Sequence, residues 1–277
     1  MRTPAENAQL ALLLEVAGTP KPGNVDRHRD LPDLRFEHFL AGAVGAGPGL
    51  RAADEGASVG EAFETAVAGM ADQSGGNTQF GALLLLVPLV VTAADGDVTA
   101  DTVRSVVENT TVADAADFYR AFDHVAVAVD DPPEAAEVPD VRRGSDAVAD
   151  VEAAGSTLRD VMAAAADRDD VAREWVEGFE RSFAAADRIA ATEGPVPARV
   201  AETFLWLLSR RPDTHVATVH GDRVARRVMV RAQSARDRGH VEEFADALVE
   251  AGINPGTTAD LAAAGCFLAL ERDGIEV

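Results

Sequence analysis

The chain has 277 residues, of which 47% are hydrophobic and only 5% aromatic, so alanine, valine and leucine must fill a large core. Its net charge of −22 argues against nucleic acid and against an anionic membrane surface as partners, because no broad basic stripe exists. So many carboxylates with almost no lysine are typical of a protein from a salt-loaded cytoplasm, where salt screens self-repulsion.

No signal-peptide pattern opens the chain, and its longest apolar run, 82–91, is interrupted by Pro88 and is too short to span a bilayer. We therefore expect a soluble, cytoplasmic protein. Cys266 is the only cysteine, which excludes an intramolecular disulfide and a cysteine-based zinc site.

Helix signals follow one another along the chain. A capping box at 3–6 opens a helix that we expect to reach Val16, and 58–61 opens another that should end near Asp72. The last helix should run from 257 to about Glu271. Apolar residues at helical spacing recur between them, over 36–53, 78–94, 102–128, 156–166, 171–191, 198–210, 223–236 and 241–251.

Alternating strand patterns are weak, and only 214–219 and 228–230 are short strand candidates. We therefore expect an all-α protein of roughly ten helices. An acidic, proline-rich segment at 130–141 cannot be helical and must be solvated. Candidate site residues fall on both sides of it, so it is interpreted as a surface loop within a single domain covering 1–277.

The first candidate site contains Lys21, the only lysine beside 24 arginines. It lies in Thr-Pro-Lys-Pro-Gly, residues 19–23, where Gly23 permits a tight turn or the close approach of a ligand. An ammonium is a compact point charge that arginine does not reproduce, and it suits phosphate. Together with Arg27, it predicts a site for an anionic small molecule.

The residues that follow Gly23 include three that alternate by two, namely Asp26, His28 and Asp30. In an extended segment this spacing places all three side chains on one side, as ligands of a hard cation or as acid and base groups. A solvated charged loop is the alternative interpretation.

The second candidate is the glycine-rich turn at 74–81, directly before the most hydrophobic helix. Gly76 and Gly81 leave backbone N–H groups open to an anion at the helix N-terminus, and Asn77 and Thr78 add neutral hydrogen-bonding groups. It is no Walker loop, because no lysine follows and no strand precedes it. The same turn would also serve as a plain helix cap.

The third candidate runs from Asn254 through Gly256 to Asp260, again a turn into a helix start. Helix capping would explain Asp260 without any function.

Together the three loops resemble the triphosphoribosyl-dephospho-CoA synthase family. Residues 19–27 look like its N-terminal motif, 76–78 with Gly81 are similar to its central Asn-Thr-His-Lys-Gly, and 254–261 resemble its C-terminal Pro-Gly-Gly-x-Ala-Asp-Leu. The motifs occur in the family's order and span nearly the whole chain.

This chain departs from the family pattern at three positions. Gln79 and Phe80 replace the His-Lys pair of the central motif, which removes a cation or acid/base group, and Thr257 replaces the second glycine of the C-terminal one. The central run looks more like an archaeal and methylotroph branch that is associated with tetrahydromethanopterin-type cofactor synthesis.

The resemblance implies transfer of a 5-triphosphoribosyl group from ATP to dephospho-CoA or a related hydroxyl acceptor, with release of adenine. It implies Mg²⁺ with ATP, and a nucleotide as the small-molecule partner. The alternatives are a nucleotide-dependent enzyme of tetrahydromethanopterin-type cofactor synthesis and a non-catalytic nucleotide-binding protein.

On this reading each loop residue receives an expected role. The candidate acid and base groups are His28, Asp26 and Asp260, and the candidate Mg²⁺ ligands are Asp26 and Asp30. Substrate and phosphate would contact Lys21, Gly23, Arg27, Gly76, Asn77, Thr78, Gly81, Asn254 and Gly256. Weaker candidates are Asp114, Asp117, Tyr119, Asp213 and His215.

Overall fold

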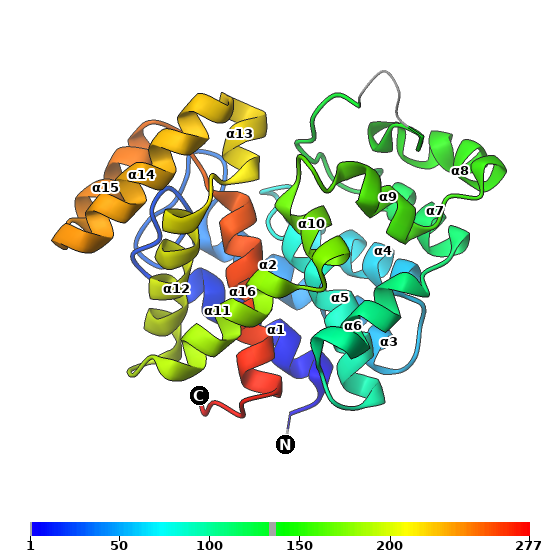
Figure 1. The fold of residues 1–277 in the computed structure, drawn as a ribbon, viewed down its shortest axis with the longest axis horizontal. Coiled ribbons are helices and arrows are strands. Elements are labelled where there is room, and N and C mark those ends of the chain that lie inside the picture. The colour runs from blue at the N-terminus through cyan, green and yellow to red at the C-terminus, as the bar shows by residue number, and fades with distance from the viewer. Residues whose placement is uncertain (1, 133–136) are drawn as a thin grey trace.

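The computed structural model describes residues 2–132 and 137–277, and within them it is helical with no strand (Figure 1). The all-α prediction is confirmed. The part of the predicted acidic loop that covers 133–136 lies outside the described residues. The helices are α1 (Pro4–Ala17), α2 (Phe36–Gly45), α3 (Gly47–Asp54), α4 (Val59–Met70), α5 (Phe80–Asp95), α6 (Ala100–Glu108), α7 (Val112–Ala121), the 3-10 helix η1 (Val141–Ala147), α8 (Val148–Ala154), α9 (Leu158–Ala165), α10 (Asp170–Glu177), α11 (Glu180–Ala191), α12 (Val196–Arg210), α13 (Thr214–His220), α14 (Asp222–Arg238), α15 (Val241–Glu250) and α16 (Gly256–Glu271).

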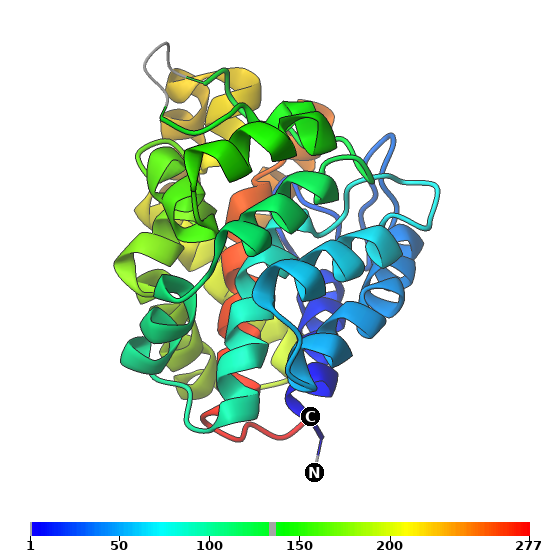
Figure 2. The same ribbon diagram turned by 90° about the vertical axis from the view of Figure 1, so that its right-hand side faces the viewer.

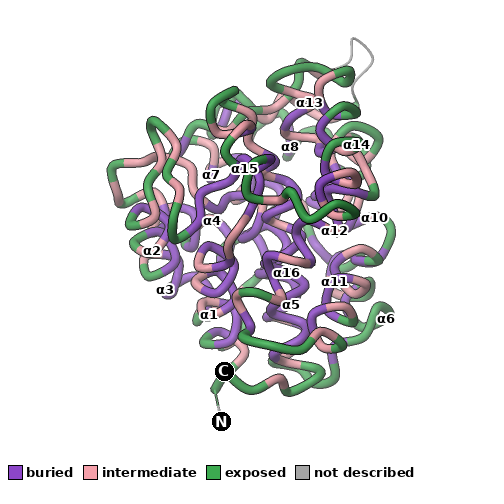
Figure 3. Tube along the Cα trace, turned by 90° about the vertical axis from the view of Figure 1, so that its left-hand side faces the viewer, coloured by how far each residue is buried: buried purple, intermediate pink, exposed green. Residues whose placement is uncertain are grey.

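The C-terminal helix α16 forms the centre of the fold. Thirteen of its sixteen residues are buried, and it packs against α1, α5, α11 and α12 (Figures 1 and 3). Small side chains permit this close packing, since a Cβ on Gly265 would lie only 2.5 Å from the Cβ of Ala185 in α11. An alanine-rich helix with no exposed face can therefore sit inside a ring of others.

The second core helix, α5, lies beside α16 (Figure 2). It contains Pro88, which lacks an N–H, and the Thr92 hydroxyl donates a 2.8 Å hydrogen bond to the Pro88 carbonyl. Eleven residues of α5 are buried. Its N-terminus and that of α16 both point into the region where the candidate loops lie.

The described residues contain sixteen α-helices, so the expectation of roughly ten was too low. Three long periodic segments are broken. The segment 36–53 turns at Ala46 into a helix with Pro48 in its first turn, 102–128 restarts where Thr111 caps α7, and 171–191 is interrupted at Gly178 with φ of 75°. Hydrophobic periodicity continues across such breaks, because both pieces bury one face in the same core.

Both predicted strands are helical, which corrects that expectation. Residues 214–219 lie in α13 and 228–230 in α14. The Asp213 carboxylate accepts a hydrogen bond from the N–H of Val216 and caps α13, so a local start signal outweighs the β-branched residues that follow.

Among the described helices, none alone is long and apolar enough to cross a membrane. The pair α5 and α6 passes that test by length and composition, but the two helices meet at 110°.

Candidate active site

The three candidate loops, far apart in sequence, meet at one place. The Asn24 amide donates a 2.9 Å hydrogen bond to the side-chain oxygen of Asn254, which joins the first loop to the third. Gly23, at φ 76°, lies so close to the third loop that a Cβ there would be 2.1 Å from the Ile253 carbonyl oxygen. A Cβ on Gly81 would lie 2.2 Å from Oδ2 of Asp260, which joins the second loop to the third.

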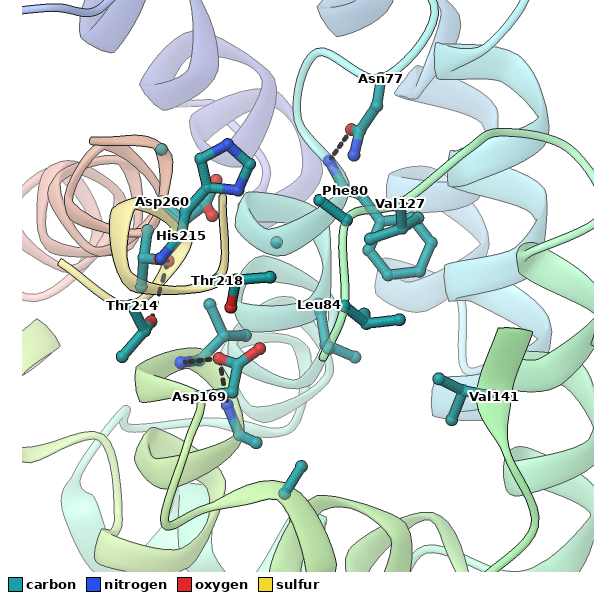
Figure 4. A pocket seen from close by; sticks show the side chains of 18 of the residues that line it. Asn77, Phe80, Leu84, Val127, Val141, Asp169, Thr214, His215, Thr218 and Asp260 are labelled. Carbon is teal, nitrogen blue, oxygen red and sulfur yellow. Dashed lines mark hydrogen bonds between the residues drawn. The ribbon is translucent and has the colours of Figure 1, made fainter. Parts of the chain in front are cut away.

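A cavity of about 540 Å³ opens between these loops and the residues 127–132 and 137–141. Figure 4 shows two kinds of wall: Asp260, His215, Thr214 and Asp169 gather on one side, while Phe80, Leu84, Val127 and Val141 form the other. The predicted site residues that line it are Asn77, Thr78, Gly81, Asn254, Gly256 and Asp260. A cavity with an apolar wall and a few polar groups is the usual form of a small-molecule site.

The segment 26–29 is a tight turn in which Asp26 and Arg29 exchange two backbone hydrogen bonds. This corrects the expected extended segment with Asp26, His28 and Asp30 on one side. Asp26 is fully buried, whereas His28 and Asp30 are exposed. The Asp26 carboxylate accepts hydrogen bonds from the Thr19 hydroxyl and from the N–H groups of Lys21 and His28, and its buried charge thereby organises the loop.

Lys21 is fully buried behind the cavity. Its ammonium donates to Glu15 at 2.5 Å and to the Asn24 side-chain oxygen at 3.0 Å, and lies 5.9 Å from the centre of the Phe204 ring. Glu15 and Asn24 line the cavity, but Lys21 does not. Lys21 therefore reaches the cavity only through Glu15 and Asn24, and its ammonium is not part of the lining as the predicted phosphate contact would require.

The rest of the first loop lies outside the cavity. Arg27 and His28 are exposed, and the Asp30 carboxylate accepts a 2.8 Å hydrogen bond from the N–H of Phe36 at the start of α2. Arg29, which had no assigned role, pairs with Asp246 and Glu242 of α15 and ties this loop to that helix.

The second loop is held from both ends. Asn77 accepts a 3.1 Å hydrogen bond from the N–H of Phe80 and so caps α5, while Gly76 lies in the turn with φ of 72°. His38 of α2 hydrogen-bonds the Ser74 hydroxyl, and a Cβ on Gly75 would lie 2.4 Å from its Nδ1. The histidine therefore positions the glycine turn, a role for which the sequence around it gave no signal.

Asp260 does not cap its own helix, because α16 begins at Gly256 with Pro255 as its N-cap and Asp260 is the fifth residue of the helix, so the capping explanation is wrong. Its carboxyl instead faces the start of α5 and the cavity (Figure 4). Burial raises its pKa well above the ordinary value, and the charges of Glu15, Asp213 and Asp169 raise the pKa further, against a smaller effect of the Ala82 N–H.

Two further carboxyls belong to this acidic group. Asp169 lines the cavity and accepts hydrogen bonds from the N–H groups of Val171 and Ala172, and burial raises its pKa. Asp213, whose pKa burial also raises, accepts from the N–H and the hydroxyl of Thr258, both at 2.7 Å. It joins the starts of α13 and α16.

His215, a weak candidate in the sequence, lines the cavity next to Asp260 (Figure 4). The other weak candidates do not line it. Asp114 accepts hydrogen bonds from the Gly60 N–H and from Thr111, and Asp117 pairs with Arg120 in the same helix. The Tyr119 hydroxyl donates to the Pro139 carbonyl.

Within 2–132 and 137–277, no three His, Cys, Asp or Glu side chains are arranged to hold a metal ion by themselves. Asp26 and Asp30 do not converge on a common point, because the turn buries one and exposes the other. Any metal in the cavity would therefore need ligands from a bound substrate.

The fold and the cavity define a helical enzyme with an acidic site for a small molecule, around which three loops of the same chain meet. The family model described as CitG, ATP:dephospho-CoA triphosphoribosyl transferase, matches residues 1–276, and the chain belongs to that family of transferases. The resemblance seen in the three motifs is thereby confirmed.

A crystal structure of a candidate triphosphoribosyl-dephospho-CoA synthase from Archaeoglobus fulgidus has the same fold. It superposes with a TM-score of 0.71 at 29% sequence identity, over 84% of this chain and 99% of that one. No curated protein matches the chain.

Proposed function

We propose that the protein transfers the 5-triphosphoribosyl group of ATP to a hydroxyl of dephospho-CoA and releases adenine. The observation that carries the proposal is the meeting of all three motif loops around one cavity, with Asp260 between them. At about 540 Å³, the cavity is of the size that small-molecule sites usually have. Membership in the CitG family supports the same reaction.

The reaction breaks the N-glycosidic bond of ATP and forms a C–O bond to the acceptor. The hydroxyl loses a proton and the departing adenine gains one, so a single acid/base group can serve both ends. Asp260 suits this work, because burial and the neighbouring carboxyls raise its pKa and so favour the protonated form that an acid must have. It donates to the leaving base and, as a carboxylate, takes the hydroxyl proton.

The α5 N-terminus is the proposed binding place for the ribose and phosphate oxygens. Thr78 and the positive end of this helix face the cavity, while Asn77 keeps the turn in place by capping α5. Lys21 would act from behind the wall, where its ion pair holds Glu15 and its hydrogen bond holds Asn24. In this proposal it is a positioning residue.

Mg²⁺ would enter the site with the triphosphate. The buried carboxyl groups of Glu15, Asp213 and Asp169 lie near Asp260 and raise its pKa, and a divalent cation would offset negative charge in such a group. Asp169 is the carboxylate that would share such an ion with the phosphates, in line with the usual binding of Mg²⁺ through one or two carboxylates. When bound, the ion would neutralise phosphate charge.

The test is chromatography of Mg-ATP after incubation with the protein in concentrated KCl, with and without dephospho-CoA. We expect adenine only when dephospho-CoA is present, and none with Asp260→Asn. ATP binding without adenine release would contradict the proposed acceptor, and pterin precursors would then be tested. If ATP binds but no acceptor leads to adenine release, the result would favour a non-catalytic nucleotide-binding protein.

A further inference from the structure

Three buried polar atoms, carried by two residues that line the cavity, have no hydrogen-bond partner among the described residues. They are Oγ1 of Thr78 and both Nε2 and Oε1 of Gln79, and they make up half of the six such side-chain atoms in the described parts of the chain. Gln79 is only 4% exposed. Because buried polar groups are nearly always paired in proteins, a concentration on two consecutive residues calls for a ligand.

The position of the two residues points to the same conclusion. Both line the cavity and directly precede Phe80 and Gly81, where α5 begins opposite Asp260. They lie over Gly42 of α2, since a Cβ there would be 2.6 Å from Oγ1 of Thr78 and 3.1 Å from Oε1 of Gln79. A glycine at 42 thus leaves room for two polar side chains that the protein itself does not pair.

The chemistry of the unpaired atoms restricts the ligand. A carboxamide carries one acceptor and one donor group side by side, so its partner must offer both. Phosphate oxygens only accept, and cannot pair with Oε1 of Gln79. The N6/N7 edge of adenine offers an N–H donor next to an acceptor and is the edge that Asn and Gln bind in a bidentate manner. Guanine presents two acceptors, O6 and N7, at the same positions.

We propose that Gln79 is the adenine-recognition residue of this cavity. Its flexible side chain turns into the cavity when nucleotide binds, Oε1 accepts from the N6 amino group, and Nε2 donates to N7. The Thr78 hydroxyl pairs with a neighbouring polar atom of the same nucleotide. The inference rests on the proposed function, since it assigns one part of the ATP site.

This contact also serves the departure of the base. As the glycosidic bond breaks, the bonding electron pair moves onto adenine, and a donor at N7 stabilises the charge that develops there. Gln79 therefore provides part of the stabilisation of the leaving base that a cationic side chain would provide, without adding a charge to a buried site.

The experiment measures calorimetric binding of Mg-ATP, Mg-GTP and the Mg complex of 7-deaza-ATP, which lacks the N7 acceptor, in concentrated KCl. The native protein is compared with Gln79→Leu and, should that variant fold poorly, Gln79→Met. Thr203→Val is the matched control, because Thr203 is also buried with an unpaired hydroxyl but does not line the cavity.

We expect the native protein and the Thr203→Val variant to bind ATP about tenfold more tightly than GTP or 7-deaza-ATP, and the Gln79 variants to lose that preference while folding normally. A Gln79 variant that keeps the full preference would overturn the adenine assignment but leave the proposed reaction standing. A native protein that binds no ATP would overturn both.

Discussion

Gly81 and Asp260 are packed so closely that any side chain at position 81 would displace the carboxyl. An added Cβ would lie 2.2 Å from Oδ2 of Asp260 and 2.8 Å from its Cγ. Since Gly81 is the second residue of α5 and Asp260 projects from α16, the contact sets where the acidic group stands relative to the α5 N-terminus. The glycine is therefore needed for close approach, not for an unusual backbone angle.

Gly81→Ala should lower adenine release strongly at a modest cost in stability. The added methyl forces Asp260 to move, and a small overpacking of this kind costs about 1–3 kcal/mol of unfolding free energy. The measurement is kcat for adenine release together with a denaturant titration. The control is Gly47→Ala, where the added Cβ meets the flexible ends of Gln9 and Arg51. Full activity in Gly81→Ala would show that the position of Asp260 is unimportant.

The buried ion pair between Lys21 and Glu15 gives a second prediction. Lys21→Met leaves an unpaired carboxylate in the interior and should destabilise the protein by about 3–5 kcal/mol. The double variant Lys21→Met/Glu15→Gln removes both charges and should recover much of this loss. Denaturant unfolding of the two single variants and the double variant measures the coupling. If Lys21→Met unfolds like the native protein, the ion pair contributes nothing.

Asp260 should make the protein less stable as the pH rises. Its folded pKa is raised above the ordinary value of 3.8, so between these two values the native state binds more protons than the unfolded chain. Stability from this group is thus present at low pH and lost as the pH rises through the folded pKa. Asp260→Asn should raise the melting temperature most at the higher pH values, measured without nucleotide.

Asp114 provides the control of opposite sign. Hydrogen bonds from Gly60 and Thr111 lower its pKa despite its burial, so its stabilising contribution is present above the ordinary value and is lost as the pH falls. Asp114→Asn should lower the melting temperature at neutral pH and have less effect in acid. If the melting temperatures of Asp260→Asn and Asp114→Asn changed with pH in the same way, the pKa directions given for Asp260 and Asp114 would both be contradicted.

The meeting of the three loops was predictable, whereas the contacts inside it were not. The resemblance of all three motifs to one family indicated a shared site, and Gly23, Gly81 and Asn254 indeed make the connecting contacts. Whether Lys21 faces a ligand or a buried carboxylate depends on Glu15, in the last turn of α1, and nothing in the local pattern of a helix identifies such a partner.

Asp169, which the sequence did not indicate, and Asp213, which it indicated only weakly, show a further reason why part of the acidic group was not predicted. Each has the local appearance of a helix cap, and each does cap a helix, as their bonds to Val171 and Val216 show. Their additional role arises only because α10 and α13 bring both carboxyls near Asp260. Tertiary proximity of this kind leaves no periodic or compositional trace.

Removal of divalent cations should weaken nucleotide binding. Acidic residues outnumber basic ones in the lining of the cavity, where Asp167 and Asp169 flank Arg168, so a triphosphate without a cation meets net repulsion there. We expect chelation by EDTA in concentrated KCl to weaken ATP binding by about tenfold or more, and Asp169→Asn to depend less on Mg²⁺ than the native protein does. Calorimetric titrations with and without Mg²⁺ measure both effects.

Glu6→Gln, an exposed change in α1 away from the cavity, is the control that should keep the native Mg²⁺ dependence. Equal ATP affinity with Mg²⁺ and with EDTA would contradict the role given to the ion, because the carboxylates would then repel the triphosphate too weakly to require it.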